Sequence, residues 1–450
     1  MKKTFSIFAF CLLFPMLVLS DSIVFSVDSA APFTLHADEG RTLAFEAPEV
    51  LEIDEERTAP ANWDAAWADF EVWPSDGKGK GAWSLFPRYD EDGSIILGGA
   101  FRQLVPGSVK ITSSDGATAF QEGTDYRVNQ EWGFVANVDN RLGVPGTVTL
   151  RFQAKLALQR IDLVQKDAEG RLSVKKGESR RISPMIPDPD AGCTAVAGVY
   201  LAPWQRDGAW KILPEDIFPI DAEKAKPVEL VRPEAVAKTL EKLREGTPVT
   251  IAFIGDSLTL GAEAGQWWSD DSTTWRGRVM RGLKARFPAS EITELPAFQG
   301  GRGIAFGLDV VKETVLPAKP DLAFVMLGVN DCHKGISAPG PTTPVDAFRK
   351  GFDSLIAQCQ ESGMDVVVLS SMETNPFDAN GDAVRWADYR AAIRAVSDAR
   401  GTAYGDTYEQ WQRLRYRGIP PFSQLHNWIN HPGSWGHGLF ADVALRFFPE

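Results

Sequence analysis

The chain has 450 residues, of which 44% are apolar and 24% are charged, and its 47 Lys and Arg against 60 Asp and Glu give a formal net charge of -13. This composition excludes an intrinsically disordered chain, and the length suffices for two or three domains of roughly 150 residues. The acidic balance argues against a nucleic-acid partner, because such proteins gain affinity from Lys and Arg beside phosphates. A sugar or another small neutral substrate fits better.

The first 20 residues have the pattern of a secretory signal peptide. Lys2 and Lys3 precede an apolar run from Phe5 to Leu19, and small or polar residues follow. We expect cleavage after Ser20 or Ser22 and a secreted or periplasmic protein. No later stretch approaches ~20 uninterrupted apolar residues, so no stable membrane insertion is expected after cleavage; an uncleaved anchor is the alternative.

The cysteines give no sign of a disulfide framework or a metal site. Cys11 has no small residues before it and is not read as a lipid-attachment site, and cleavage leaves Cys193, Cys332 and Cys359. An odd number leaves at least one thiol free. No Cys/His cluster has the spacing of zinc ligands, so we expect neither a metal nor another cofactor.

Residues 23–230 predict a β-rich domain. Short alternating runs such as 108–112 and 146–152 are separated by turn residues, which is typical of a β-sandwich or jelly-roll-like fold. Four tryptophans, at positions 63, 67, 73 and 83, would form either part of a core or a platform for a glycan; a core is the simpler interpretation. Residues 231–246, with Pro233 and a charged helical stretch, predict a linker.

Residues 247–450 predict a three-layer α/β domain. Apolar runs at 249–254, 292–298, 322–327, 366–369 and 402–404 alternate with helical patterns near 275–287, 303–315, 345–362 and 382–400. Continuous apolar runs are expected for parallel strands that are covered on both faces. We therefore expect about five parallel strands.

Polar and glycine residues follow the predicted strands. Ser257 comes directly after the first strand, Gly301 follows the second and Asn330 the third, and His431 lies near the C-terminus. Ligands of such sheets bind beyond the carboxyl ends of the strands. A serine nucleophile needs a base, and the histidines available are His36, His333, His426, His431 and His437.

These segments resemble the four conserved blocks of the SGNH/GDSL hydrolase family. The blocks here are Gly-Asp-Ser-Leu at 255–258, the glycine after the second strand, Gly-Val-Asn-Asp at 328–331 and His-Pro at 431–432. Gly301, Asn330 and His431 lie 44, 73 and 174 residues after Ser257, and these separations also fit the family. The resemblance covers about residues 247–450.

The resemblance implies a flavodoxin-like sheet and ester hydrolysis without a metal. It implies that Ser257 is the nucleophile and that its N–H, the Gly301 N–H and the Asn330 amide form the oxyanion hole, with Gly300 as an alternative to Gly301. It also implies that His431 is the general base.

The sequence departs from the family pattern at one position. The family places an aspartate three residues before the histidine, where this chain has Trp428. Either the Trp428 carbonyl orients His431, or a carboxylate such as Asp406 or Glu409 does so, or the enzyme is impaired. A Ser257–His431 dyad supported by the Trp428 carbonyl is the favoured interpretation.

Further polar residues lie near the predicted site. Arg302, His333 and Glu373 are candidates for substrate binding, while Asp256 and Asp331 are expected to organise their loops. His437 is expected to pack at the start of the last helix, and His426 would either line the cleft or sit in solvent.

The sequence therefore predicts a secreted serine esterase that removes short acyl groups, in the first place acetyl, from an acylated carbohydrate. Three other functions stay open: a periplasmic polysaccharide O-acyltransferase, a lipid acylhydrolase, and a glycan-binding protein whose hydrolase domain has decayed.

Overall fold

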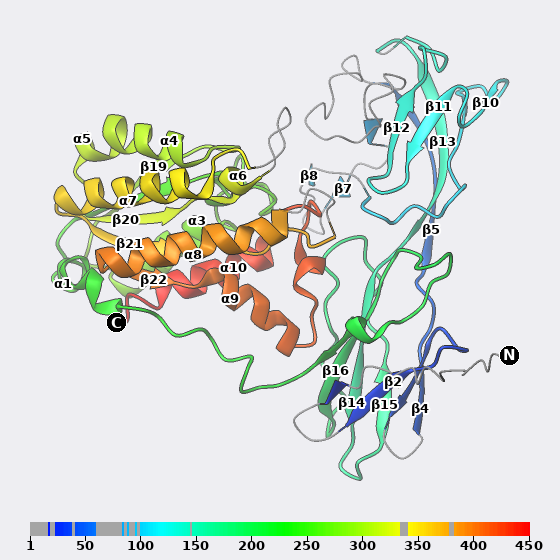
Figure 1. Cartoon of the computed structure of the whole chain (residues 1–450), viewed down its shortest axis with the longest axis horizontal. Coiled ribbons are helices and arrows are strands. Elements are labelled where there is room, and N and C mark those ends of the chain that lie inside the picture. The colour runs from blue at the N-terminus through cyan, green and yellow to red at the C-terminus, as the bar shows by residue number, and fades with distance from the viewer. Residues whose placement is uncertain are drawn as a thin grey trace, which may run out of the picture.

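The computed structural model describes residues 17–18, 23–37, 41–59, 83–84, 88–89, 95–96, 100–144, 146–333, 341–377 and 382–450. Most of the predicted signal peptide lies outside the described residues, as do Trp63, Trp67 and Trp73, and Trp83 is described by its backbone alone. Both interpretations of these tryptophans, a core and a platform for a glycan, therefore stay predictions. The α/β part of the molecule lies on one side and the β-rich part on the other (Figure 1).

Five parallel strands form the sheet of the α/β part, as predicted. In their order across the sheet they are β19 (Ile292–Phe298), β18 (Val249–Gly255), β20 (Leu322–Met326), β21 (Asp365–Leu369) and β22 (Ala403–Gly405). β20 and β21 are buried along their whole length, as expected for central strands covered on both faces. The chain runs from β18 to β19 and then back past β18 to β20, so the strand order reverses beside β18. Such a switch point is where ligands of this fold class bind.

Helices cover both faces of this sheet. α3 (Trp275–Arg286) and α10 (Ser434–Leu445) pack against each other on one face, and α4 (Ile304–Val310), α7 (Val345–Glu361) and α8 (Asp382–Arg400) pack in succession on the other. Right-handed crossovers require this division, because the chain reverses its direction across the sheet after β19. The predicted three-layer α/β fold is confirmed.

Shorter helices complete the α/β part. They are α1 (Ala237–Arg244), α2 (Ser257–Leu260), the π-helical turn Val311–Val315, α5 (Leu316–Ala318), α6 (Val329–Cys332), α9 (Thr407–Gln412) and the 3₁₀ turns Pro233–Val236, Arg413–Tyr416 and Pro421–Gln424. No helix in the described part of the chain is both long enough and apolar enough to cross a membrane.

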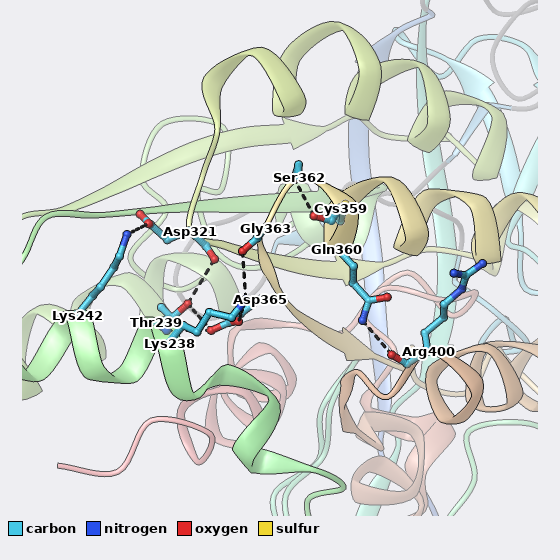
Figure 2. Close-up of polar contacts among 10 residues, drawn as sticks. All are labelled: Lys238, Thr239, Lys242, Asp321, Cys359, Gln360, Ser362, Gly363, Asp365 and Arg400. Carbon is cyan, nitrogen blue, oxygen red and sulfur yellow. Dashed lines mark hydrogen bonds and ion pairs between the residues drawn. The ribbon is translucent and has the colours of Figure 1, made fainter.

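The segment predicted as a linker is fastened to the sheet. Val231 forms a β-bridge with Tyr404, and Thr239 of α1 donates its N–H and its hydroxyl to the Asp365 carboxylate at 2.8 and 2.9 Å. Lys242 pairs with Asp321 at 2.5 Å (Figure 2). These contacts lie at the amino ends of β20 and β21, so α1 seals the edge of the sheet opposite the predicted site.

The β-rich part consists of antiparallel strands. They are β1 (Leu17–Val18), β2 (Val24–Val27), β3 (Thr34–Ala37), β4 (Arg41–Ala44), β5 (Val50–Thr58), β6 (Trp83–Ser84), β7 (Arg88–Tyr89), β8 (Ile95–Ile96), β9 (Lys110–Ser113), β10 (Ala119–Phe120), β11 (Tyr126–Asn129), β12 (Phe134–Asn137), β13 (Thr149–Ala157), β14 (Arg160–Lys166), β15 (Leu172–Lys175), β16 (Thr194–Leu201) and β17 (Ile217–Pro219). The expectation of a β-rich region is confirmed.

These strands bury two separate hydrophobic clusters, and the sandwich or jelly-roll arrangement stays a prediction. One cluster includes Ile111 and Phe152 of β9 and β13, and the other includes Leu35 and Val199 of β3 and β16. The long strands β13 and β14 are separated by two residues only, so the chain passes directly from one cluster to the other. The alternating pattern of each strand indicates a buried face, but it does not indicate which strands share that face.

Aromatic side chains join the β-rich part to the α/β part. We call Phe101, Trp132, Tyr200, Trp204, Phe377, Phe422 and Trp428 the aromatic bridge. Trp204 is central, with ring centroids 5.4 Å from Phe377 and 6.4 Å from both Phe101 and Trp428. The bridge is continuous with the core around the parallel sheet, so the two parts share one hydrophobic core.

Candidate active site

Ser257 lies just after the carboxyl end of strand β18. β18 stops at Gly255, and Asp256 caps the short helix α2 by accepting the Leu258 N–H at 3.0 Å. Ser257 is the first residue of that helix and remains partly exposed, whereas Asp256 and Leu258 are buried. A buried strand followed by a capped turn holds the serine backbone rigid while its hydroxyl faces outward, as a nucleophile requires.

The loop after the 3₁₀ turn at 421–424 brings His431 to this serine. The His431 Nε2 lies 2.8 Å from the Ser257 Oγ, although the residues are 174 positions apart. The loop is closed by the His426 N–H, which donates to the His431 carbonyl at 2.7 Å, and by a bridge between Leu425 and Pro432. The structure therefore brings together the two residues predicted as nucleophile and base.

The other ring nitrogen of His431 faces Asn427. Asn427 Nδ2 is 3.0 Å from His431 Nδ1, while Asn427 Oδ1 accepts the backbone N–H groups of Ile429, Asn430 and His431, each at 2.9 Å. Sequence reasoning missed Asn427, because no motif marks an asparagine four residues before the histidine. The only available signal was the presence of two asparagines, Asn427 and Asn430, in a short loop, because asparagine often caps loops.

Trp428, predicted to orient His431 through its carbonyl, makes different contacts. Its carbonyl accepts Asn375 Nδ2 at 2.7 Å, and its ring is buried in the aromatic bridge. Its φ is +59°, in the left-handed region that a tryptophan rarely adopts. The group at His431 Nδ1 is the Asn427 side chain, and the Trp428 carbonyl is instead bonded to Asn375.

Neither candidate for a distal acid contacts His431. The Asp406 carboxylate caps α9 through the Glu409 N–H at 3.0 Å and accepts the Ser370 hydroxyl at 2.9 Å. The Glu409 carboxylate pairs with Arg413 at 3.5 Å. Among the described residues, no carboxylate forms a hydrogen bond or ion pair with His431.

The loop after β19 approaches the serine from the side. A Cβ atom placed on Gly300 would lie 3.8 Å from the Ser257 Cβ, and Gly301 has a φ of +70°, where a side chain would be strained. Gly300 is thus the nearer neighbour of Ser257, and Gly301 supplies the turn. Both stay candidates for the second oxyanion donor.

Asn330 lies at the start of α6, beyond β20. Its Nδ2 donates to the Arg302 carbonyl at 3.0 Å and to Asp256 Oδ2 at 3.3 Å. The amide therefore links the three loops that follow β18, β19 and β20. Asp331 beside it accepts the Ile304 N–H with both carboxylate oxygens, at 3.1 and 3.0 Å, which matches its expected role in the loop.

Burial shifts the pKa values of the site. Desolvation lowers the pKa of His431 to about 4, although the side chain keeps some exposure, and this favours a neutral imidazole near pH 7. Burial raises the pKa of Asp256 to about 7, partly offset by the hydrogen bond from Leu258, and burial also raises the pKa of Asp331. Titratable groups with such shifts cluster at functional sites.

The three residues predicted to bind substrate differ in their surroundings. Arg302 is exposed beside Gly301. His333 ends α6, and its carbonyl accepts the Thr342 N–H and hydroxyl, both at 2.9 Å. Glu373 is half-buried and accepts Gln412 Nε2 at 2.8 Å, so its carboxylate is joined to α9. Of the three, Arg302 has the most exposed side chain.

Two other histidines are buried near the site. His426 is buried in the histidine loop, so the solvent-exposed alternative does not hold. His437 packs inside α10 as expected, and its Nδ1 accepts the Trp275 N–H at 3.3 Å. Burial lowers the pKa of His437 to about 3.

The described residues contain no group of three or more His, Cys, Asp or Glu that could hold a metal ion. Cys193, Cys332 and Cys359 are free thiols, and Cys332 and Cys359 are buried.

Comparisons with known proteins agree on the α/β part. Residues 253–439 match the model of the GDSL-like Lipase/Acylhydrolase family. No curated protein has a significantly similar sequence. Among solved structures, Axe2, an acetylxylan esterase from Geobacillus stearothermophilus, is similar with a TM-score of 0.39 and 19% identity, covering 45% of this chain and 94% of that chain.

LAE5, an alpha/beta hydrolase enzyme from the metagenome of Lake Arreo in Spain, is similar with a TM-score of 0.38 and 21% identity, covering 44% of this chain and 94% of that chain. The family match spans the parallel sheet, the serine and the histidine, and it confirms the resemblance seen in the sequence. The C-terminal part of this chain is therefore a GDSL-like lipase/acylhydrolase domain, an ester hydrolase by family.

Proposed function

We propose that this protein is a secreted or periplasmic serine esterase that removes short acyl groups, in the first place acetyl, from a carbohydrate. The observation that carries the proposal is the 2.8 Å contact between His431 Nε2 and Ser257 Oγ at the carboxyl end of the parallel sheet. A hydroxyl beside an imidazole is the arrangement that activates a serine for attack on an ester.

The reaction passes two protons through His431, one in each half-reaction. The Ser257 Oγ attacks the ester carbonyl carbon while Nε2 takes its proton, and the same proton then passes to the departing sugar oxygen as the C–O bond breaks. Water attacks the resulting acyl-serine, gives its proton to Nε2, and the acid leaves as Ser257 regains that proton. The low pKa of His431 keeps the imidazole neutral at the start of each half-reaction.

The oxyanion would be held by the Ser257 N–H, by the N–H of Gly301 or Gly300, and by the Asn330 amide. In the free enzyme both Nδ2 protons of Asn330 are used, one by the Arg302 carbonyl and one by Asp256 over the longer distance of 3.3 Å. The weaker contact with Asp256 is the one that the oxyanion would replace.

Two exposed tryptophans support a carbohydrate substrate. Trp268, 53% exposed, lies on the loop between α2 and α3, and Trp435, 39% exposed, lies on the first turn of α10. Arg278 of α3 donates to the carbonyls of Thr273 and Ser434, at 3.1 and 3.3 Å, and so holds these two segments side by side. Flat aromatic faces on the segments that follow the nucleophile and the base in the chain suit the faces of sugar rings, and exposed Arg302 suits their hydroxyls.

The test is hydrolysis of aryl acetate, butyrate and decanoate and of an acetylated xylo-oligosaccharide by the full chain. Ser257→Ala and His431→Ala should each lower the rate by at least ~100-fold, as for members of one catalytic unit, and Ser269→Ala, which removes an exposed hydroxyl from the loop between α2 and α3, should not. Undiminished hydrolysis by Ser257→Ala would refute the assignment of the nucleophile.

The same assay separates the other functions. A preference for decanoate would indicate a lipid acylhydrolase, and acetyl transfer to an added unacetylated oligosaccharide would indicate an O-acyltransferase. Binding of the oligosaccharide without turnover of any ester would indicate a glycan-binding protein.

A further inference from the structure

The orientation of the Asn427 amide is fixed by its own loop. Its Oδ1 accepts three backbone N–H groups, those of Ile429, Asn430 and His431. Turning the amide over would place the NH₂ group against these three donors, at a cost of several hydrogen bonds in a part-buried loop. The Nδ2 atom must therefore face His431, and it also donates to Asn430 Oδ1 at 3.2 Å.

A donor at Nδ1 determines which nitrogen of the imidazole carries the proton. Asn427 Nδ2 can only donate, so at 3.0 Å it requires a lone pair on His431 Nδ1. The neutral ring then carries its proton on Nε2, which points at the Ser257 Oγ. A general base needs the opposite tautomer, with the proton on Nδ1 and a free lone pair on Nε2.

We propose that Asn427 is a positioning residue that occupies the place of the triad acid and holds His431 in the Nε2–H tautomer, so that the free enzyme is a restrained esterase. This inference rests on the proposed function and deepens it. To act as a base, His431 must first move its proton to Nδ1 and lose the hydrogen bond from Asn427.

The size of the restraint can be bounded. In Ser-His-Asp triads, replacing the acid by its amide keeps the geometry but lowers kcat by about 10⁴, because the tautomer is wrong. This chain has the amide from the start. The reverse change, Asn427→Asp, keeps one oxygen for the three backbone donors and places the other beside Nδ1, where it accepts a proton and stabilises the imidazolium.

The surroundings of His431 allow Asn427→Asp to change the protonation of the ring. Burial lowers the pKa of His431, and the neighbouring His437 has its pKa lowered by burial and by the positive charges of His431, Arg278 and His426. No carboxylate among the described residues pairs with His431. A new carboxylate at 427 would therefore be the first negative charge in direct contact with the ring.

The first measurement does not depend on activity. In full-length protein labelled with ¹⁵N-histidine, the five histidines are resolved, and His431→Gln identifies the signals of His431. We expect the signals of the Nε2–H tautomer in the wild type at neutral pH, and those of an Nδ1–H or doubly protonated ring in Asn427→Asp. An Nδ1–H ring in the wild type would overturn the proposal even if the protein is an active esterase.

The second measurement is the pH profile of kcat/KM for aryl acetate. Asn427→Asp should raise kcat/KM by at least ~10-fold and move the acid limb upward, because the carboxylate favours the imidazolium. Asn430→Asp adds the same charge to the same loop without facing Nδ1, because its carboxylate reaches the ring only through Asn427 Nδ2, so its effect on both quantities should be much smaller than that of Asn427→Asp. An equal effect of the two variants, or none, would reject the role of Asn427.

Failure of the proposed function would look different. If neither the wild type nor Asn427→Asp cleaves any ester while the ¹⁵N signals show the Nε2–H tautomer, the assignment of Asn427 stands and the esterase proposal falls. If the esters are cleaved and Ser257→Ala abolishes cleavage in both backgrounds, only the tautomer signals and the comparison with Asn430→Asp decide the role of Asn427.

Discussion

Asn375 holds Trp428 through its side-chain amide, which donates to the Trp428 carbonyl at 2.7 Å, and its backbone N–H donates to the neighbouring Ile429 carbonyl at the same distance. Asn375 lies in the segment that follows β21, and its Oδ1 accepts the Phe377 N–H at 2.9 Å. The segment that follows the carboxyl end of β21 thus holds the loop that carries His431 through these two hydrogen bonds. The left-handed backbone at Trp428 is held from both sides, by this amide and by the aromatic bridge.

Asn375→Asp should weaken the contact between this segment and the loop that carries His431. The substitution keeps the volume but replaces the donor by a carboxylate oxygen that faces the Trp428 carbonyl in a buried site. A buried polar group without a partner costs about 1–3 kcal/mol, and more when it is charged. We expect the free energy of unfolding to fall by at least that amount and kcat for aryl acetate to fall with little change in KM, because the imidazole is misplaced.

The control is Asn137→Asp in the β-rich part. This asparagine likewise donates through Nδ2 to a carbonyl, that of Gly143 at 2.9 Å, and its Oδ1 accepts the Leu142 N–H at 3.0 Å, in a turn of the β-rich part. Denaturant unfolding and initial rates would be measured on both variants. If Asn375→Asp keeps the wild-type rate but has a lower free energy of unfolding, Asn375 matters for stability alone.

The aromatic bridge couples the β-rich part to the catalytic loop. Trp204→Ala removes the ring between Phe377 and Trp428, and Phe152→Ala removes a ring of comparable burial from the separate cluster of β13. Each should lower the free energy of unfolding by about 3–5 kcal/mol. At a temperature where both variants are folded, only Trp204→Ala should lower kcat, by about 10²-fold, because a shift near 1 Å at His431 is enough for that loss.

Equal rate losses in these two variants would mean that the β-rich part supports activity through overall stability and not through the bridge. Circular dichroism at the assay temperature would establish that each variant is folded. The deletion of residues 23–230 is a poor substitute, since the two parts share one hydrophobic core.

The sequence was sufficient for the sheet, because five apolar runs predicted the five strands. Ser257 and His431 were predicted from short blocks at a strand end and near the C-terminus, and the structure places the Ser257 Oγ and the His431 Nε2 2.8 Å apart. Parallel strands place their carboxyl ends along one edge, so local blocks far apart in sequence predict a common site.

The residues that support the site could not be predicted from the sequence in the same way. Asn427 and Asn375 act through side-chain contacts whose partners are fixed only by the path of the loop, and asparagines in loops are common as turn residues. Phe101 and Trp204 look like ordinary core residues, and their contact with Trp428 crosses more than 200 positions of the chain. Glu373, a candidate for substrate binding, also accepts Gln412 Nε2, a contact that depends on the path of the loop after β21 and that no sequence pattern indicates.

The pH dependence of activity should reflect the low pKa of His431. The imidazole stays neutral down to about pH 4, so the acid limb of kcat/KM should lie near 4 and not near the ordinary value of 6.5. The measurement is the rate of aryl acetate hydrolysis from pH 3.5 to 8, corrected for unfolding. An acid limb between 6 and 7 would contradict the desolvated imidazole.

The low pKa of His431 also makes the free energy of unfolding decrease as the pH falls. The folded pKa of about 4 lies below the ordinary value of 6.5, so the unfolded chain takes up a proton first as the pH falls. The contribution of His431 to the free energy of unfolding is therefore lost between pH 6.5 and 4. The difference between the wild type and His431→Gln across this window isolates the effect, since the buried His437 titrates in both proteins.

Two glycines at the start of α10 give a matched pair of substitutions. A Cβ atom on Gly433 would overlap the imidazole of His426, whereas a Cβ atom on Gly438 would meet nothing closer than 3.6 Å. The φ of Gly433 is -79°, which any residue adopts, so the obstacle is the ring and not the backbone. Gly433→Ala should push His426 out of place and, through its N–H bond to the His431 carbonyl, displace the base.

We therefore expect Gly433→Ala to lower both the melting temperature and kcat for aryl acetate. Gly438→Ala should leave kcat unchanged and raise the free energy of unfolding by about 0.5–1 kcal/mol, because alanine replaces glycine inside a helix. Thermal melts and initial rates on the two variants test this together. Wild-type activity in Gly433→Ala would mean that the histidine loop can relax around a displaced His426, and that the hydrogen bond from His426 does not position His431.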